Sequence, residues 1–406
     1  MTPDAIQQAW SDGLIVPLAG PARRDQEALA AAIGPAGPAA VLEPLQQHWG
    51  PGVVLSSGGS SGRRRWCLQP LSNLEASARA TGTWLAAQGL DPGACLHLNP
   101  MPLHHVSGLL PVVRARLWGC RQQRLEPSLL RDPATLAAAV LVPSEQPVLL
   151  SLVPTQLQRL MAAPQGLAWL RQLALIWVGG APLPAALAER ARGAGLRLAP
   201  CYGATETAAM VTALPPDRFL AGTCGCGQAL ADVELRIDAG SCAIAVRSAR
   251  LSPGWLEHGQ LQPLPRRVGG WWCSGDGGQL GPAGLVVRGR LDGAIHSGGE
   301  TVFPEALEER LLASAAAAGL SLQALLLLPV DDPLWGQQLV ALVRPADATD
   351  PELLLARLEA CSQDWAAAER PRRWLICDQL APTIHGKWQR GHWQRWLASL
   401  EAWPKV

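Results

Sequence analysis

Hydrophobic and polar positions in the middle of the chain follow a repeating pattern. The segment PVLLSLV from Pro147 is a nearly uninterrupted apolar run, and PTQLQRLM follows it with Pro154 at its start. LALIWVGG from Leu173 repeats the arrangement and continues into PLPAALAERARGAG, where Leu183 and Leu187 are four positions apart. The apolar runs predict buried strands, and the four-residue spacing predicts one face of a helix. Repeated strand and helix predict parallel sheets covered by helices, with ligands bound at the carboxyl ends of the strands.

The pattern changes in the last third of the chain. From Trp255 to Pro282, Gly, Pro and Trp dominate, which predicts short antiparallel strands and turns. A helix is expected from Pro304, closed by Gly319, with a second alternation of strands and helices after it. We therefore predict an α/β protein of two domains. Residues 1–291 form a large domain of helix-covered sheets with a small antiparallel β region, and residues 292–406 form a small α+β domain.

Length and composition favour a folded chain of two domains. The chain has 406 residues, a length that exceeds the usual size of a domain with a single core. Hydrophobic residues make up 48% of it, which is enough to form packed cores. Its 34 basic and 33 acidic residues leave a net charge of +1, so no nucleic-acid partner is expected. The ten cysteines show neither disulfide nor zinc spacing. The start lacks a signal-peptide pattern and the apolar runs are too short to span a bilayer, so we expect a soluble, cytoplasmic protein.

A glycine- and serine-rich segment, SSGGSSGRRRW from Ser56, follows the apolar run PGVVLS. Glycines let several backbone N–H groups point at one anion, serine hydroxyls add donors, and arginines add charge. This combination is typical of a phosphate-binding loop, although a mobile polar loop has the same composition. The pattern G-x-x-x-x-G-K-[ST] is missing, which excludes a P-loop NTPase.

Four further segments pair glycines with isolated reactive side chains. They are CYGATETAAM from Cys201, WCSGDGGQL from Trp272, GRLDGAIHSGGETVFPEALE from Gly289 and APTIHGKWQR from Ala381. Together with SGGSSG, and in this order, they resemble the motifs of the adenylate-forming superfamily, which includes acyl-CoA ligases, nonribosomal adenylation domains and luciferase. The resemblance implies that ATP, with Mg²⁺, converts a carboxylic acid into an acyl-adenylate, and that coenzyme A then takes up the acyl group.

Most residues that the resemblance assigns would bind ATP. SGGSSG takes the place of the family's phosphate loop, and Arg65 stands where the family usually has a lysine. Tyr202, the only tyrosine of the chain, lies in YGATE, where the family packs the ring on adenine. WVGGAPL matches the adenine and acyl pocket, although an ordinary strand-to-helix turn has the same glycines. Asp276 and Arg290 match residues near the ribose, although Asp276 also suits a turn. The expected ATP-binding residues are Ser57, Gly58, Gly59, Ser60, Ser61, Gly62, Arg65, Gly179, Gly180, Ala181, Tyr202, Gly203, Asp276 and Arg290.

The resemblance implies four catalytic residues. Thr205 would contact phosphate and Glu206 would bind magnesium, which typically takes one carboxylate plus substrate phosphates. The alternative is a helix start with Thr205 as N-cap and Glu206 in the first turn. Lys387 would stabilise charge developing on the acyl and phosphate oxygens. His105 would line the acyl pocket, and its alternative is a core histidine.

The segment SLVPTQLQRL from Ser151 resembles the o-succinylbenzoate–CoA ligases of menaquinone and phylloquinone synthesis. The implied acid is 2-succinylbenzoate, with Thr155, Gln156 and Arg159 as contacts beside His105 and Gly203. Arg159 is equally well explained as a surface helix residue. Alternatives are another aryl- or acyl-CoA ligase, an adenylation enzyme that loads a carrier protein, and a nucleotide-binding regulator without turnover. A homo-oligomer is left open.

The resemblance also implies that the C-terminal domain is mobile. Asp292 falls on the family's hinge, about which this domain rotates between the two half-reactions. The rotation would withdraw Lys387 and present the loop Ser297, Gly298 and Gly299 for thioester formation.

Overall fold

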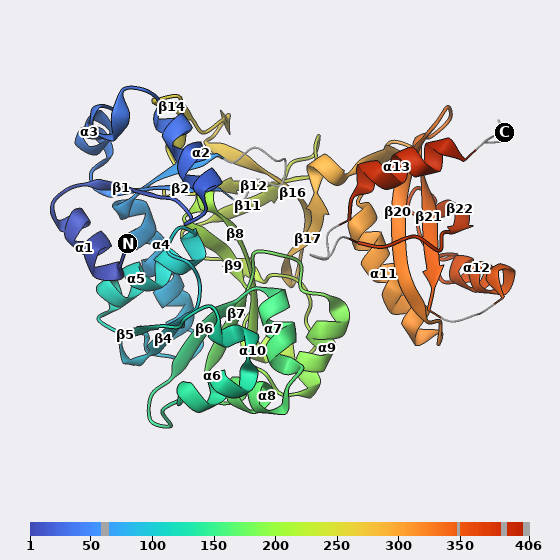
Figure 1. Ribbon diagram of the computed structural model, residues 1–406, viewed down its shortest axis with the longest axis horizontal. Helices are drawn as coiled ribbons and strands as arrows, with labels where there is room; N and C mark the ends of the chain where they lie inside the picture. Colours follow the sequence, from blue (N-terminus) through green and yellow to red (C-terminus); the bar gives the residue numbers. More distant parts are fainter. Residues whose placement is uncertain (58–64, 347–349, 383–387, 401–406) are drawn as a thin grey trace. The chain divides into compact units, whose positions relative to one another are not determined.

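The computed structural model describes residues 1–57, 65–346, 350–382 and 388–400 (Figure 1). The chain forms two compact units. The first contains Met1–Ser274 and Gly278–Val287, and the second contains Gly275–Gly277 and Arg288–Val406. Each unit combines helices and sheets, which confirms the predicted fold class. The predicted boundary after residue 291 and the rotation about Asp292 stay predictions.

The first unit carries most of the helices and strands. Its helices are α1 (Pro3–Ser11), α2 (Arg23–Ile33), α3 (Gly37–Trp49), α4 (Leu71–Ala86), α5 (Val106–Trp118), α6 (Pro133–Ala139), α7 (Pro154–Met161), α8 (Pro164–Leu170), α9 (Ala185–Gly193) and α10 (Pro216–Leu220). Its strands are β1 (Ile15–Leu18), β2 (Gly52–Ser56), β3 (Trp66–Pro70), β4 (Leu96–Asn99), β5 (Arg121–Arg124), β6 (Val148–Leu152), β7 (Leu175–Val178), β8 (Leu198–Ala204), β9 (Ala209–Ala213), β10 (Gln228–Ala229), β11 (Glu234–Ile237), β12 (Ala243–Arg247), β13 (Gly254–Glu257), β14 (Gln260–Pro263) and β15 (Arg266–Arg267). Two longer strands, β16 (Trp271–Gly281) and β17 (Gly284–Arg290), contribute residues to both units.

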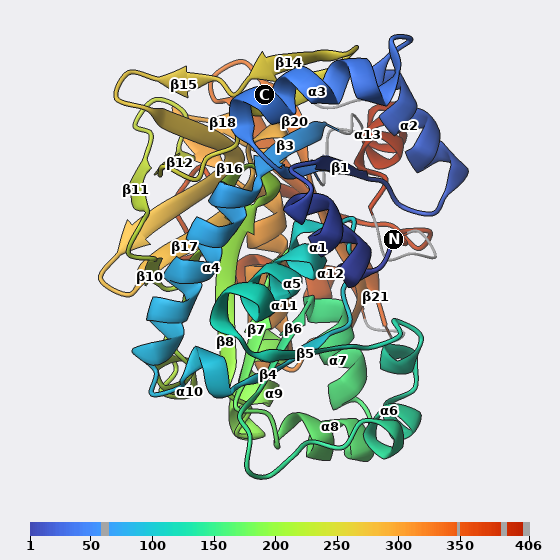
Figure 2. The same cartoon turned by 90° about the vertical axis from the view of Figure 1, so that its left-hand side faces the viewer.

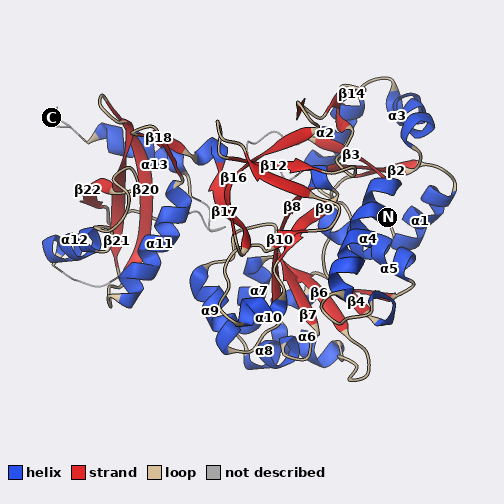
Figure 3. Cartoon of the chain, turned by 180° about the vertical axis from the view of Figure 1, so that it is seen from behind, coloured by secondary structure: helices blue, strands red, loops and turns tan. Residues whose placement is uncertain are grey.

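A seven-stranded sheet in the order β10-β9-β8-β7-β6-β4-β5 forms the centre of the first unit. From β8 to β5 the neighbouring strands are parallel, as predicted from the strand-then-helix pattern. Helices α6 to α10 cover one face with a core that includes Leu157 and Trp169, and α4 lines the other face (Figures 2 and 3). The predicted helix after β7 begins only at Ala185, so Leu187 lies in α9 and Leu183 precedes it.

Two smaller sheets complete the first unit. One has the order β1-β2-β3-β13-β14, and the other has the order β11-β12-β16-β15 with β17 beside β16. The strands that follow Pro253 pair in antiparallel fashion, which confirms the interpretation of the Gly-, Pro- and Trp-rich stretch. The hairpin formed by β2 and β3 contains the glycine- and serine-rich segment between its strands.

The second unit is built on its own five-stranded sheet, with the order β19-β18-β21-β20 and β22 beside β21. Its elements are β18 (Ile295–Ser297), β19 (Glu300–Val302), α11 (Pro304–Ala317), β20 (Leu322–Asp332), β21 (Gly336–Pro345), α12 (Pro351–Ala360), β22 (Pro371–Ile376) and α13 (Arg390–Ser399). The helix predicted from Pro304 is confirmed. The expected alternation is wrong at β20 and β21, which follow each other directly as an antiparallel pair.

Both faces of this second sheet are buried (Figure 1). Leu325 and Leu327 of β20 pack with α11 and α12, whereas Leu326 and Leu328 pack with α13. Burial on both faces explains the continuous apolar run in this strand.

Among the residues described, no single helix has the length and apolar character needed to cross a membrane. Only α2 and α3 taken together, bent by 63°, pass that test of length and composition.

Candidate active site

Three predicted site segments follow neighbouring parallel strands, and a fourth, YGATE, begins in the next strand, β8. β4, β6, β7 and β8 lie side by side, with Leu152 paired to Val178 and Val178 paired to Pro200. The loop with His105 follows β4, helix α7 follows β6, and Gly179 follows β7. The carboxyl ends of parallel strands meet at one edge of the sheet, and open α/β sheets bind ligands there. These segments therefore share one edge of the first unit.

The YGATE segment forms the end of β8 and the turn after it. One 3₁₀ turn, Thr205–Thr207, connects β8 to the antiparallel β9. Ala204 occupies the cap position, so the alternative of a helix capped by Thr205 is wrong. The next two residues, Ala208 and Ala209, have φ values of 51° and 79°. This left-handed conformation costs an L-residue roughly 1–2 kcal/mol, so other contacts must hold the turn.

The carboxylate of Glu206 is buried against the indole of Trp255. Glu206 is 8% exposed, and its Oε1 accepts a hydrogen bond from Nε1 of Trp255 at 3.0 Å. The guanidinium of Arg65 lies over the same ring, 4.4 Å from its centroid. The N–H of Ser57 donates to the carbonyl of Arg65 at 2.8 Å and closes the base of the predicted phosphate loop. The structure thus brings Arg65 and Glu206 to one tryptophan that the sequence did not single out.

Two further segments hold the backbone of this turn. Nε2 of Gln69, a fully buried residue of β3, donates to the carbonyl of Thr205 at 2.6 Å. The N–H of Ser252 donates to the carbonyl of Glu206 at 2.8 Å. Burial, and then the charge of Glu206, raise the pKa of the nearby Cys67 thiol well above its ordinary value, so this neighbour stays uncharged. Gln69 was detectable only as a polar residue in an otherwise apolar strand.

Close packing accounts for two of the predicted glycines, and a left-handed backbone conformation accounts for a third. A Cβ on Gly203 would lie 2.1 Å from the carbonyl oxygen of Ala209, where the register of β8 and β9 shifts. A Cβ on Gly179 would lie 2.9 Å from Sγ of Cys201, and Gly180 has a φ of +78°. The alternative of a strand-to-helix turn therefore explains why glycine occupies positions 179 and 180. Their role in binding ATP stays a prediction, as does that of Ala181.

Tyr202 is anchored by its hydroxyl group. The hydroxyl donates to Oγ of Ser274 on β16 at 3.0 Å, and Ser274 is buried. This hydrogen bond fixes the orientation of the only tyrosine ring in the chain. Packing of the ring on adenine stays a prediction.

The predicted acid-binding residues differ in how their side chains are placed. His105 is exposed at the cap position of α5, so the alternative of a core histidine is wrong. Thr155 and Arg159 are exposed on α7, in agreement with the surface alternative for Arg159. Oε1 of Gln156 accepts a hydrogen bond from the N–H of Val153 at 3.0 Å. The amide oxygen of Gln156 therefore stabilises the start of its own helix.

In the second unit, Arg290 pairs with two carboxylates. Its Nη1 lies 3.1 Å from Oδ1 of Asp276, and its Nη2 lies 3.3 Å from Oδ2 of Asp292. Asp276 belongs to strand β16, so its alternative as a turn residue is wrong. The predicted ribose contacts and the predicted hinge residue thus form one ion-pair network. Their roles with ATP and in domain rotation stay predictions.

The predicted thioester-step loop is the tight turn between β18 and β19. Ser297 pairs with Glu300, and the two residues between them, Gly298 and Gly299, have φ values of 57° and 84°. Positive φ at both central residues is the usual geometry of a two-residue hairpin and requires glycine or a similar residue. A Cβ on Gly298 would lie 2.6 Å from the ring of Trp335. Glycine at position 298 therefore lets the turn pack closely against that ring.

Some predicted residues lie outside the described part of the chain. They are Gly58, Gly59, Ser60, Ser61, Gly62 and Lys387. The assignments of these residues stay predictions.

The family can be identified by comparison with known proteins. The family model described as "AMP-binding enzyme" matches residues 16–243, more than half of the 406-residue chain. The chain belongs to this family. The match includes the β2–β3 hairpin, the four neighbouring parallel strands and the YGATE turn, and confirms the resemblance stated from the motifs.

Individual relatives agree with this family. The 2-succinylbenzoate–CoA ligase of Enterococcus faecalis is 28% identical over 353 residues, covering 82% of this chain and 67% of the relative. The structure of Escherichia coli MenE with a phenylether-linked analogue of OSB-AMS matches with a TM-score of 0.63 at 27% identity, covering 85% of this chain and 69% of that one. The o-succinylbenzoate CoA synthetase of Bacillus subtilis has the same fold, with a TM-score of 0.64 at 22% identity over 84% of this chain and 68% of that one.

The side chains present fit a magnesium site completed by substrate. Within the described ranges, no group of three or more His, Cys, Asp or Glu side chains is arranged to hold a metal ion. Glu206 instead supplies one buried carboxylate beside the binding edge. Magnesium is commonly bound by one or two carboxylates together with substrate phosphates. One protein carboxylate and a triphosphate therefore suffice for such a site.

Proposed function

We propose that this chain is a 2-succinylbenzoate–CoA ligase. It would use ATP and Mg²⁺ to adenylate the acid and would then transfer the acyl group to coenzyme A. The observation that carries the proposal is the joint contact of Arg65 and Glu206 with Trp255. A cation at the base of a glycine- and serine-rich loop, beside a single buried carboxylate, suits a magnesium-bound triphosphate. The names of the relatives support the choice of acid.

In the first half-reaction, an oxygen of the acid's carboxylate attacks the α-phosphorus of ATP. The bond between the α- and β-phosphates breaks, and pyrophosphate leaves. Arg65 and the glycine- and serine-rich segment that follows Ser57 would bind the phosphates, Thr205 would contact the α-phosphate, and Glu206 would hold magnesium, whose charge offsets that of the phosphates. Lys387 would stabilise the charge on the oxygens between which the new bond forms. Positioning and charge stabilisation supply most of the catalysis in such a reaction.

In the second half-reaction, the thiol of coenzyme A attacks the acyl carbon of the adenylate. The C–S bond forms, the bond to AMP breaks, and the thiol proton passes to solvent. We propose that the second unit rotates about Asp292 between the two steps, so that Lys387 is replaced by the Ser297–Gly299 turn. The two-glycine hairpin supports this role because a backbone without Cβ atoms can approach the substrate closely.

Recognition of the acid requires a group for its second carboxylate. Arg159 is the cation on α7, and its exposure leaves the guanidinium accessible to a ligand. Thr155 at the start of the same helix supplies a hydroxyl, and His105 follows the neighbouring strand β4. We assign the second carboxylate to Arg159 and Thr155, and the acyl chain to the loop of His105.

A panel of acids incubated with the purified chain, ATP and Mg²⁺ tests the proposal. Release of pyrophosphate with 2-succinylbenzoate, and formation of its CoA thioester detected by mass spectrometry, is the expected result. Activity only with long-chain acids would contradict the assigned substrate. Pyrophosphate release without use of coenzyme A would instead indicate an enzyme that loads a carrier protein.

A further inference from the structure

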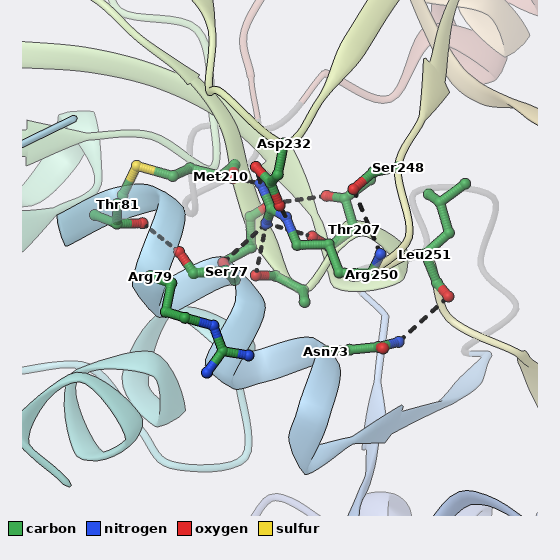
Figure 4. Close-up of polar contacts among 12 residues, drawn as sticks. Asn73, Ser77, Arg79, Thr81, Thr207, Met210, Asp232, Ser248, Arg250 and Leu251 are labelled. Atoms are coloured by element: carbon green, nitrogen blue, oxygen red, sulfur yellow. Dashed lines mark hydrogen bonds and ion pairs between the residues drawn. The ribbon is translucent and has the colours of Figure 1, made fainter. Parts of the chain in front are cut away.

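A buried arginine holds the turn that follows Glu206 (Figure 4). Arg250 lies after β12 and is only 1% exposed. Its Nη1 donates to the carbonyl of Thr207 at 2.8 Å and to that of Ala208 at 3.4 Å. Its Nη2 donates to the carbonyl of Met210 at 2.9 Å. One guanidinium thus contacts the backbone on both sides of the link between the 3₁₀ turn and β9.

The turn needs such support because of its backbone conformation. Ala208 and Ala209 are consecutive left-handed residues, and neither is a glycine. Conformations of this kind persist only when surrounding contacts enforce them, and they are concentrated at functional sites. The carbonyls that Arg250 contacts belong to Ala208 itself and to the residues that flank the pair.

Arg250 is itself held in a fixed orientation. Nε lies 2.6 Å from Oδ2 of Asp232, and Nη1 donates to Oγ of Ser77 on α4 at 2.8 Å. Nδ2 of Asn73, also on α4, donates to the carbonyl of Leu251 at 3.3 Å. Figure 4 shows the guanidinium between Ser77 and Asp232, directed toward the Thr207 turn. A planar, five-donor group fixed from two sides sets the direction of each hydrogen bond it donates.

The same short segment also contacts Glu206. Ser252, two residues after Arg250, donates its N–H to the carbonyl of Glu206, and Trp255 donates to the Glu206 carboxylate. Residues 250–255 therefore fix the backbone before and after the strained pair as well as the carboxylate.

We propose that Arg250 is a positioning residue for Glu206: it locks the left-handed turn so that the carboxylate is presented to magnesium-bound ATP. The inference rests on the proposed function. Arg250 touches neither nucleotide nor metal in this scheme, and acts only through the carbonyls of Thr207, Ala208 and Met210. Its loss should therefore weaken the coupling between magnesium and ATP, in addition to any loss of stability.

The test is the magnesium dependence of ATP binding, measured by calorimetry without any acid, for the wild-type chain and Arg250→Met. We expect the magnesium concentration for half-maximal ATP binding to rise about tenfold, as is usual when a residue supporting a metal ligand is removed. Asp232→Asn removes the counter-charge of Arg250 but leaves the guanidinium in the chain, so it should raise this concentration less than Arg250→Met does. Arg114→Met is the matched control, since Arg114 is 2% exposed and its guanidinium lies against Thr81 and Trp177 instead.

The outcomes separate positioning from a structural role. A lower melting temperature of Arg250→Met with an unchanged magnesium requirement would overturn the inference, as would equal shifts in Arg114→Met. If Arg250→Met does not fold, Arg250→Lys is measured in its place. Lysine keeps the positive charge but lacks the planar guanidinium, so the magnesium concentration for half-maximal ATP binding should rise about threefold. If the wild-type chain binds ATP with magnesium but uses no acid, the proposed function fails and the variants still decide the role of Arg250. ATP binding that is independent of magnesium in the wild type overturns the inference.

Discussion

Nε1 of Trp255 donates a hydrogen bond of 3.0 Å to Oε1 of Glu206. The two residues lie 49 positions apart in the sequence and meet because β13 pairs with β3, which also supplies Gln69 to the same turn. The indole therefore fixes the one carboxylate that we assign to magnesium. Its π face also carries Arg65, so one ring orients both charged groups of the proposed phosphate site.

Replacing Trp255 by Phe separates these two functions of the ring. Phenylalanine keeps an aromatic face for Arg65 but removes the N–H that Glu206 accepts. A hydrogen bond to a charged group contributes about 1.5–3 kcal/mol, so we expect kcat/KM for ATP to fall by at least about tenfold. Steady-state pyrophosphate release at several magnesium concentrations measures this change.

Trp255→Leu, which removes both contacts, is the comparison variant. It should lower kcat/KM further than Trp255→Phe, because Arg65 then also loses its support. Equal activity of Trp255→Phe and the wild type would show that the indole N–H does not orient Glu206.

The local elements of the fold could be predicted because their signals lie within a few residues. The apolar run before Pro154 predicted β6 and the helix α7, and Pro304 correctly marked the start of α11. The motif order also identified the family. The antiparallel β20–β21 pair was missed because its strands are buried on both faces and so lack the alternation that reveals a hairpin.

The partners of the site residues could not be predicted. Arg250, Trp255 and Gln69 reach the YGATE turn from segments 42 to 136 positions away, and nothing in their local sequence marks those contacts. For the turn itself, a helix start capped by Thr205 was the alternative, and the structure contradicts it. The chain reverses direction there because Ala208 and Ala209 both adopt the left-handed conformation. A glycine at either position would have indicated such a conformation in the sequence, whereas alanine does not.

The ion pair of Arg390 and Glu308 should stabilise the second unit. Nη2 of Arg390 lies 2.8 Å from Oε2 of Glu308, and the N–H of Leu327 donates to the other carboxylate oxygen at 2.8 Å. Burial raises the pKa of Glu308, with Arg390 acting in the opposite direction. Arg390→Met leaves this carboxylate buried without its cation, so we expect a loss of about 2–3 kcal/mol in the free energy of unfolding. Urea denaturation measures it.

A second substitution checks the cause of that loss. Adding Glu308→Gln to Arg390→Met removes the unpaired charge and should recover part of the stability. A loss below about 0.5 kcal/mol in the single variant would mean that the pair contributes little beyond an exposed one.

His97 should make the first unit less stable in acid. Burial, and then the charge of Arg114, hold the pKa of His97 well below its ordinary value of 6.5. The unfolded chain therefore binds a proton below pH 6.5 that the folded chain does not, and stability falls as the pH falls. This group alone should remove about 1 kcal/mol of unfolding free energy between pH 6.5 and 5.5. His97→Leu should abolish that part of the pH dependence in urea denaturation.

His48→Leu, at an exposed position on α3, controls for the loss of one histidine. At neutral pH, His97→Leu should lose at most about 1 kcal/mol of unfolding free energy relative to the wild type. The loss is small because neither ring nitrogen of His97 has a hydrogen-bond partner among the described residues. An unchanged acid slope in His97→Leu would show that His97 binds a proton in the folded chain.

Lys387 should be needed for adenylation and not for thioester formation. Of the 34 basic residues, only Lys387 and Lys405 are lysines, so an ammonium at position 387 stands out in a chain that otherwise uses arginine. A compact point charge suits the crowded oxygens of the adenylation step better than a planar fork. We expect Lys387→Ala to lose adenylate formation by more than about a hundredfold while still forming thioester from supplied acyl-adenylate.

Two variants make this prediction specific. Lys387→Arg keeps the charge but changes its shape, and should restore only a small part of adenylation. Lys405→Ala removes the other lysine and should match the wild type in both half-reactions. If Lys387→Ala adenylates the acid at the wild-type rate, the role carried over from the family does not apply here. Equal loss of both half-reactions would instead place Lys387 in the folding of the second unit, since a residue needed only for the first step leaves the second intact.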